Sequence, residues 1–236
     1  MGETDLHRNI MFAAIESLKL HYAGQRVYVS GNILLFYEPG NRRRHVSPDV
    51  MVVKGLEHRE RDNYLVWQEG LAPNLVVEVT SDSTRDEDLE KKFEIYRDRV
   101  QVAEYFLFDP RGEYLRPALQ GYRLEAGQYV PVEPVSGRLP SLELELSLEQ
   151  YANQLRFYDP VRGGWLPTPQ EAREEAEATW KRVEIDRQCA EDARQCAEDA
   201  RQRAEDARQR ADEARQLAEA ESERLRQELA ELRRRL

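Results

Sequence analysis

Asn74-Leu75-Val76-Val77-Glu78-Val79-Thr80 is an apolar, valine-rich run with a single carboxylate inside it. Its length and its β-branched side chains favour a buried central strand. Glutamate is depleted from strands and is almost never buried without a partner. Glu78 therefore needs a compensating positive charge, which either a bound metal ion or an arginine would supply.

The residues before this run predict a second buried strand. Ser47-Pro48-Asp49 leads into Val50-Met51-Val52-Val53, which is too short for a helix. We expect this strand to begin at Asp49, so that a second carboxylate lies at the end of a buried strand.

A helix and a third strand are expected after Thr80. Thr84 and Glu87 have the spacing of a capping box. The apolar side chains that follow recur at helical spacing at Leu89, Phe93 and Tyr96. Residues 104–108 then read as a strand that Asp109-Pro110 stops.

The flanking segments complete a mixed pattern. Residues 5–22 carry apolar side chains at helical spacing, with Asp5 as the expected N-cap. Residues 27–37 predict strands around Gly31-Asn32. Short antiparallel strands are expected further along, at Tyr114, residues 122–124 and residues 129–132. The predicted fold class is α/β, with a mixed central sheet flanked by helices.

The composition changes abruptly in the last third of the chain. Thr168-Pro169-Gln170-Glu171 combines an N-cap, a first-turn proline and the acid of a capping box. From Arg187 the sequence repeats with a period of seven, and its alanines alternate by three and four, as coiled-coil seam positions do. We therefore expect a compact domain at residues 1–165 and a long, charged, alanine-rich coiled-coil helix at residues 168–236.

The end of this helix is richer in large apolar side chains than the alanine repeat. Its leucines are Leu225, Leu229, Leu232 and Leu236. Because leucine buries far more apolar area than alanine, this end should hold copies of the chain together. We expect a homo-oligomer joined through the helix, with a further contact through the compact domain left open.

The formal net charge of the chain is -10. Proteins that hold nucleic acid through phosphate contacts usually carry a basic stripe, so this balance predicts weak, salt-sensitive binding to DNA. A bound divalent metal would reverse the local sign. The chain has no apolar run of the ~18 residues that a membrane span needs and no secretory signal. We expect a cytoplasmic protein with no membrane partner.

Two carboxylates and an amine lie close together in the predicted fold. Asp49 and Glu78 belong to buried strands, and Lys91-Lys92 lies in the helix that follows. A hard divalent ion such as Mg²⁺ prefers oxygen ligands and needs only one or two carboxylates from the protein. A lysine beside it would offset charge in the transition state of phosphodiester hydrolysis, and Lys92 is the better candidate.

Each of these residues also has an ordinary interpretation. Pro48-Asp49 is typical of a turn before a strand, Glu78 could pair with an arginine, and lysines on a helix are usually solvated. The histidines show no ligand spacing and are expected on the surface or in helix packing; they are His7, His21, His45 and His58.

The chain resembles the Uma-type family of restriction endonucleases within the PD-(D/E)XK superfamily. The resemblance covers residues 3–158. It rests on four segments in a fixed order: Val46-Ser-Pro-Asp-Val-Met-Val-Val53, Pro73-Asn-Leu-Val-Val-Glu-Val-Thr-Ser-Asp-Ser-Thr84, Asp88 with Lys92 and Tyr96, and Glu104-Tyr-Phe-Leu-Phe-Asp-Pro110.

This resemblance implies a restriction-endonuclease-like core and a site for Mg²⁺ or Mn²⁺. Asp49 and Glu78 correspond to the metal ligands, and the backbone carbonyl of Val79 is a third. Glu3 resembles an acid that the family carries at its first helix and is a further candidate ligand.

One position departs from the superfamily pattern. The usual lysine two residues after the glutamate is Thr80 in this chain. The resemblance implies that the lysine function has moved into the next helix, where Lys92 matches better than Lys91.

Three functions are compatible with these features. The first is a metal-dependent endonuclease that hydrolyses DNA phosphodiester bonds. The second is a non-catalytic assembly or DNA-tethering module that keeps the nuclease fold while its coiled coil mediates oligomerisation. The third, a purely structural coiled-coil protein, leaves Glu78 without an explanation.

Overall fold

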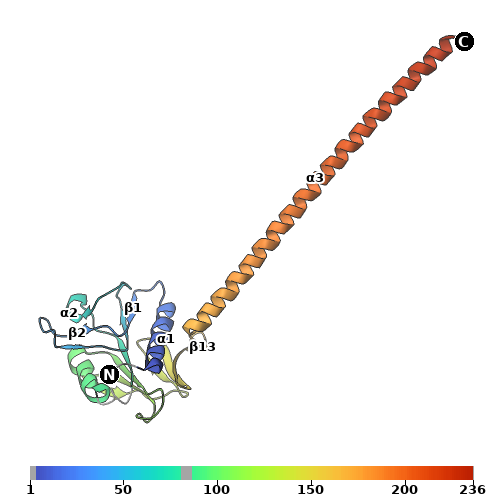
Figure 1. Ribbon diagram of the computed structural model, residues 1–236. Coiled ribbons are helices and arrows are strands. Elements are labelled where there is room, and N and C mark those ends of the chain that lie inside the picture. Colours follow the sequence, from blue (N-terminus) through green and yellow to red (C-terminus); the bar gives the residue numbers. More distant parts are fainter. Residues whose placement is uncertain (1–3, 81–86, 236) are drawn as a thin grey trace. The chain divides into compact units, whose positions relative to one another are not determined.

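The structure is a computed structural model that describes residues 4–80 and 87–235. Its internal contacts divide the chain into two units, Met1–Arg173 and Glu174–Leu236. The first unit holds all the strands and the two α-helices α1 (Asp5–His21) and α2 (Val66–Glu69) (Figure 1). The second unit is formed by the helix α3, which is described below.

A mixed six-stranded sheet forms the centre of the first unit. Its strand order is β1-β4-β6-β7-β8-β9, and only β6 and β7 run parallel to each other. The strands are β1 (Val27–Ser30), β4 (Val50–Lys54), β6 (Leu75–Val79), β7 (Glu104–Phe108), β8 (Leu119–Glu125) and β9 (Gln128–Pro131). This sheet confirms the predicted α/β class.

Alternating side chains give the central sheet two apolar faces. Leu75, Val77 and Val79 of β6 point to one side, where they join the core formed with α1. Val76 points to the opposite side, into a second core that includes Tyr96. Because successive strand residues point to opposite faces, Glu78 lies on the same side as Val76.

Two smaller sheets cover the central one. A four-stranded antiparallel sheet, β10-β11-β12-β13, contributes Leu148 and Phe157 to the core beside α1. A three-stranded sheet, β3-β2-β5, contributes Leu35 and Tyr64 to the other core. Their strands are β10 (Leu139–Ser141), β11 (Leu146–Tyr151), β12 (Gln154–Asp159), β13 (Gly164–Trp165), β2 (Leu35–Phe36), β3 (His45–Val46) and β5 (Tyr64–Leu65).

The helix α1 begins at Asp5, the residue that was predicted to be its N-cap. Thr4, not Asp5, is the N-cap, and its Oγ1 accepts a hydrogen bond from the backbone N–H of His7 at 3.2 Å. Asp5 is instead the first helical residue, where its negative charge interacts favourably with the positive end of the helix dipole. The predicted N-cap was therefore wrong by one position.

The segment after β6 is helical, but its backbone hydrogen bonds join residues five positions apart, as in a π-helix, and not four, as in an α-helix. Two π-helical stretches, η1 (Glu87–Lys92) and η2 (Ile95–Val100), follow each other closely. π-helical turns are rare in proteins, and those that occur are frequently found at functional sites. Thr84, the expected start of this helix, lies outside the described residues.

The prediction of a strand at Tyr114 was wrong. The backbone N–H groups of Tyr114, Leu115 and Arg111 all donate to the carboxylate of Asp109, which is buried. These bonds wrap the chain around the carboxylate in a loop, and they lower the pKa of Asp109 despite the opposing effect of its burial. A strand would have aimed these N–H groups at a neighbouring strand instead.

The helix α3 (Pro169–Arg235) is continuous over 67 residues. The predicted capping box is present: Glu171 N–H donates to Thr168 Oγ1 at 3.2 Å, and Thr168 N–H donates to Glu171 Oε2 at 2.7 Å. Side chains along it form intrahelical ion pairs, such as Arg187 with Glu191 at 2.8 Å. Within the described part of the chain, no helix has the length and apolar character to cross a membrane.

Candidate functional site

The strand register brings Asp49 and Glu78 together. β4 and β6 are antiparallel neighbours in which Val50 pairs with Val77. One step further along this register, Asp49 lies opposite Glu78. Directly opposed residues of an antiparallel pair have Cβ atoms roughly 4.5–5.5 Å apart, so the two carboxylates share one end of the sheet.

Asp49 ends the ladder with its side chain. The strand was expected to begin at Asp49, but β4 begins at Val50. The carboxylate of Asp49 accepts the backbone N–H of Val79 at 2.7 Å, which takes the place of a backbone ladder bond. The strand therefore starts one residue late because a side chain makes the pairing.

The second oxygen of Asp49 contacts a histidine from α1. His7 Nε2 lies 3.1 Å from Asp49 Oδ1, and both residues are buried. The Asp49 carboxylate is thus held on one oxygen by a strand and on the other by a helix.

Glu78 is fully buried, with no exposed surface. Its Oε2 accepts a hydrogen bond from Lys92 Nζ at 2.9 Å, and its Oε1 accepts one from the Tyr96 hydroxyl at 2.7 Å. Lys92 thus pairs with the carboxylate, and no arginine is needed for this interaction. A buried charge is tolerated when it is paired and hydrogen-bonded in this way.

The helical segment after β6 supplies Lys92 and Tyr96 as partners of Glu78. Lys92 ends η1 and Tyr96 lies in η2, four residues later. Burial, followed by the negative charge of Glu78, raises the pKa of Tyr96 well above its ordinary value. Tyr96 therefore keeps its proton and acts as a hydrogen-bond donor at neutral pH.

The structure separates the two candidate lysines. Lys91 is exposed, whereas the side chain of Lys92 is only 13% exposed and contacts Glu78. Thr80, which stands where the resemblance would place a lysine, is buried. Its Oγ1 donates to the Phe108 carbonyl at 3.4 Å, so the side chain bonds to the backbone of the next strand.

Two residues of this arrangement were missed in the sequence. His7 was expected on the surface or in helix packing, and Tyr96 was read as part of an apolar stripe and of the family resemblance, with no role in the site. His7 precedes the buried Ile10 by three residues and so lies on the buried face of α1. That spacing was the available signal.

The donor set is compatible with a hard divalent ion. Such an ion takes carboxylate, carbonyl and water oxygens and needs only one or two carboxylates. Asp49 and Glu78 bring carboxylate oxygens of this kind to the end of β6, where Val79 is the last strand residue. In residues 4–80 and 87–235, no three His, Cys, Asp or Glu side chains form a ready metal cluster. Glu3, the further candidate ligand, lies outside the described residues.

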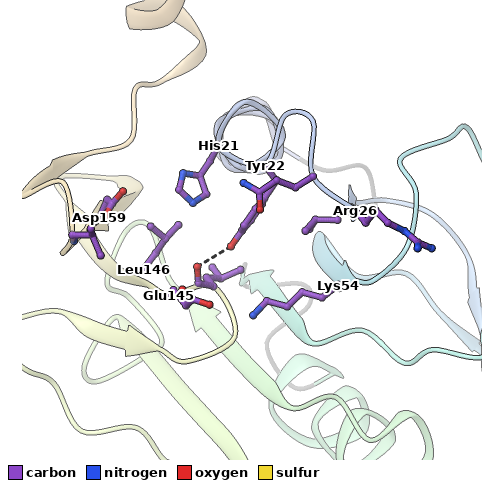
Figure 2. A pocket seen from close by; sticks show the side chains of 11 residues that line it. His21, Tyr22, Arg26, Lys54, Glu145, Leu146 and Asp159 are labelled. Atoms are coloured by element: carbon purple, nitrogen blue, oxygen red, sulfur yellow. Dashed lines mark hydrogen bonds between the residues drawn. The ribbon is translucent and has the colours of Figure 1, made fainter.

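A cavity of about 380 Å³ lies elsewhere in this unit (Figure 2). It is lined by residues such as His21, Tyr22 and Asp159, and neither Asp49 nor Glu78 borders it. Tyr22 donates its hydroxyl proton to the Leu144 carbonyl at 2.8 Å. A dashed line from Tyr22 marks this bond in Figure 2. His21 is fourteen residues beyond His7 on α1, which is about 21 Å along the helix axis. The cavity is therefore separate from the candidate site.

A match to a family model agrees with the resemblance seen in the sequence. The model of the Uma2 family, described as "Putative restriction endonuclease", matches residues 1–172. A similar solved structure is that of "a putative nuclease belonging to DUF820 from Anabaena variabilis ATCC 29413", with 14% identity, a TM-score of 0.46, and coverage of 63% of this chain and 80% of that chain. No curated protein matches the chain. Since the family model spans more than half of the 236 residues, the chain belongs to the Uma2 family.

Proposed function

We propose that the protein is an endonuclease that uses Mg²⁺ or Mn²⁺ to hydrolyse DNA phosphodiester bonds. The observation that carries this proposal is the convergence of Asp49, Glu78 and Lys92 at one end of the central sheet. Lys92 Nζ is 2.9 Å from Glu78, and Asp49 bonds to the residue that follows Glu78. Two carboxylates and one amine are the groups that metal-assisted phosphodiester hydrolysis requires.

The residues of the chain prepare this site before substrate binds. His7 and the Val79 N–H hold the two oxygens of Asp49, while Lys92 and Tyr96 hold those of Glu78. A bound metal ion would supply an acidified water and would offset charge on the phosphate. The ammonium of Lys92 lies beside Glu78. If the phosphate binds at the same place, this ammonium would offset the negative charge that develops on the phosphate in the transition state.

A plasmid-nicking assay tests the proposed activity. Supercoiled DNA incubated with the wild-type protein and Mn²⁺ or Mg²⁺ should become open-circular, and EDTA should stop the reaction. A protein that binds the metal ion but nicks no DNA under any of these conditions would instead support the non-catalytic assembly module.

The Lys92 ammonium makes a separate prediction. Lys92→Met should lower the nicking rate at saturating metal, because it removes a charge that acts in the transition state. It should also destabilise the metal-free protein by about 3–5 kcal/mol, since Glu78 would remain buried without the charge of Lys92 beside it. Added Mn²⁺ should restore more stability to this variant than to wild type, because the ion replaces the missing charge.

Lys91→Met is the matched control for this measurement. Lys91 is the adjacent residue and is exposed, so its loss should change stability by no more than about 0.5 kcal/mol. Urea unfolding of the three proteins, with and without Mn²⁺, gives the comparison. Equal unfolding free energies for Lys92→Met and Lys91→Met would show that Lys92 does not compensate Glu78.

We further propose that α3 joins copies of the chain as a coiled coil, with the grip at its leucine end. In the alanine repeat, the seam residues Ala204 and Ala207 are flanked by Arg203 and Arg208. If identical helices paired along this seam, arginines would face arginines at the positions that normally form interhelical salt bridges. Their repulsion would weaken pairing along the alanine repeat. Leu225 and Leu229 are more than half exposed in the single chain and are available for pairing.

This proposal predicts which substitutions change the oligomeric state. Replacing Leu225, Leu229 and Leu232 by serine should shift the solution mass toward the monomer, because each buried leucine contributes roughly 1.5–3 kcal/mol. Replacing Ala204, Ala207 and Ala211 by serine should have a much smaller effect. Sedimentation equilibrium over a range of concentrations measures both; an unchanged mass for the leucine variant would refute the proposed grip.

A further inference from the structure

We propose that the hairpin joining β2 to β3 binds the phosphate backbone of DNA on its approach to Asp49. The contact is made by the exposed guanidinium groups of Arg42 and Arg43. This inference rests on the proposed nuclease function and names the surface that holds its substrate.

The hairpin carries a concentrated positive charge. Arg42-Arg43-Arg44-His45 is the longest run of basic residues within Met1–Arg173, and all four side chains are exposed. The chain as a whole has a net charge of -10. A local cluster of this kind on an acidic protein attracts phosphate where most of the surface would repel it.

Two of the arginines have no carboxylate partner in the described part of the chain. Glu38 is the acid of this hairpin, and its Oε2 lies 3.7 Å from Arg44 Nε. No carboxylate within residues 4–80 and 87–235 lies within ion-pair distance of Arg42 or Arg43. Their charge is therefore available to an external anion.

The tip of the hairpin is an ordered turn. Arg44 N–H donates to the Asn41 carbonyl at 3.1 Å, and Arg43 N–H donates to Asn41 Oδ1 at 3.2 Å. The ring of His45 contacts the Arg42 carbonyl through Nδ1 at 2.9 Å. A turn fixed in this way loses less conformational freedom on binding than a loose loop would.

The hairpin is within reach of the reacting phosphate. β3 leads through Ser47 and Pro48 to Asp49, and the Pro48 carbonyl is held by the Asn32 N–H at 2.8 Å. Asp49 lies six positions beyond Arg43, which sets an upper limit of about 20 Å for the distance between their Cα atoms. At roughly 3.4 Å per nucleotide along one strand, the arginines contact phosphates within about six nucleotides of the cut.

Other arginine clusters in the protein are less suitable. Arg59 and Arg61, in the loop before β5, both pair with Glu69, at 3.2 and 2.8 Å. In the heptad repeat of α3, arginines alternate with acids, and Arg187 pairs with Glu191 at 2.8 Å. The charges of Arg59, Arg61 and Arg187 are therefore already matched within the chain.

The test compares two double variants of the full-length protein. Arg42→Gln/Arg43→Gln removes the proposed contacts, and Arg26→Gln/Arg99→Gln removes two exposed arginines that precede β1 and β7, at the end of the sheet opposite Asp49. Fluorescence anisotropy with a labelled 30-base-pair duplex, in Ca²⁺ and at several KCl concentrations, gives affinity and salt dependence. Nicking of plasmid DNA in Mn²⁺ and calorimetric titration with Mn²⁺ are measured in parallel.

The hairpin variant should bind DNA about 60-fold more weakly at 0.1 M salt, with a log–log salt slope less steep by roughly 1.8, because each phosphate contact contributes about 0.9. Its kcat/KM for nicking should fall, while its kcat and its Mn²⁺ affinity should match wild type. The control variant should change the salt slope by less than half as much as the hairpin variant does.

Two results would overturn the inference in different ways. If wild type and the hairpin variant cleave DNA and bind it with the same affinity and slope, the inference is wrong and the proposed nuclease function stands. If the wild type neither binds nor nicks DNA, both fail. Loss of binding in the hairpin variant of a protein that nicks nothing supports the hairpin contact and removes only the catalytic proposal.

Discussion

Asp49→Asn and Glu78→Gln are each expected to abolish metal-dependent nicking and metal binding together. Each substitution keeps the size of the side chain and removes one negative charge from the same strand end. Changes to groups that merely support a metal ligand typically cost 10–100-fold in affinity or activity. Loss of a carboxylate ligand itself should therefore lower the nicking rate by at least about 100-fold.

Glu104→Gln is the matched control for this pair. Glu104 is also buried in the central sheet, but it is held by Arg123 at 3.0 Å and by the Leu142 N–H at 3.0 Å. The variant removes a buried carboxylate without touching Asp49 or Glu78. Its stability should fall, whereas its Mn²⁺ affinity measured by calorimetry below the unfolding temperature should stay close to that of wild type.

The outcome separates two accounts of Glu78. If Glu78 exists only to pair with Lys92, then Glu78→Gln should alter stability and leave nicking intact. A Glu78→Gln protein that is folded, binds Mn²⁺ normally and nicks DNA would exclude Glu78 from the site.

Gly31→Ala is expected to destabilise the protein strongly and to damage the same site. A Cβ added at Gly31 would lie 1.9 Å from the backbone carbonyl oxygen of Asp49 and 2.7 Å from Cδ1 of Ile15. Overpacking in a core typically costs 1–3 kcal/mol, and a clash with backbone cannot be relieved by a change of rotamer. We expect a loss of about 3 kcal/mol or more.

The position of Asp49 makes this substitution informative about function. The carbonyl that would be displaced belongs to Asp49 itself, so the carboxylate would shift away from the Val79 N–H. Metal affinity should therefore fall even under conditions in which the variant remains folded.

Gly164→Ala serves as the comparison for Gly31→Ala. No atom lies within 4 Å of a Cβ added at Gly164, so this change should be nearly neutral. Urea unfolding gives the free energies, and Mn²⁺ titration gives the affinities. A Gly31→Ala protein as stable as the Gly164→Ala protein would show that the close approach of Gly31 to Asp49 is not real.

The central strands could be predicted from the sequence because their apolar runs are short and β-branched. Residues 104–108 form β7 with the predicted bounds, and β6 covers residues 75–79 of the predicted strand 74–80. Glu78 was recognisable because a lone carboxylate in such a run demands a partner. Lys92 was also placed correctly in the helical segment. Its spacing of four residues from Tyr96 keeps both side chains on the same face of that segment.

Other features were missed, either because a short pattern was not recognised or because they depend on tertiary contacts. The strands β10 to β13 were not predicted, although Leu146 and Leu148 in β11 alternate with polar residues in the manner of a half-buried strand. The π-turns of η1 and η2 use the same residue types as an α-helix and differ only in their hydrogen bonds. The contact of His7 with Asp49 joins residues 42 positions apart, which local spacing cannot reveal.

The position of a bound ion tests the central claim most directly. Crystals grown with Mn²⁺ can be measured at a wavelength where manganese scatters anomalously. The account predicts one anomalous peak within ligand distance, about 2.1 Å, of a carboxylate oxygen from Asp49 and one from Glu78. A protein that nicks DNA with Mn²⁺ but shows its manganese peak away from both carboxylates would contradict it.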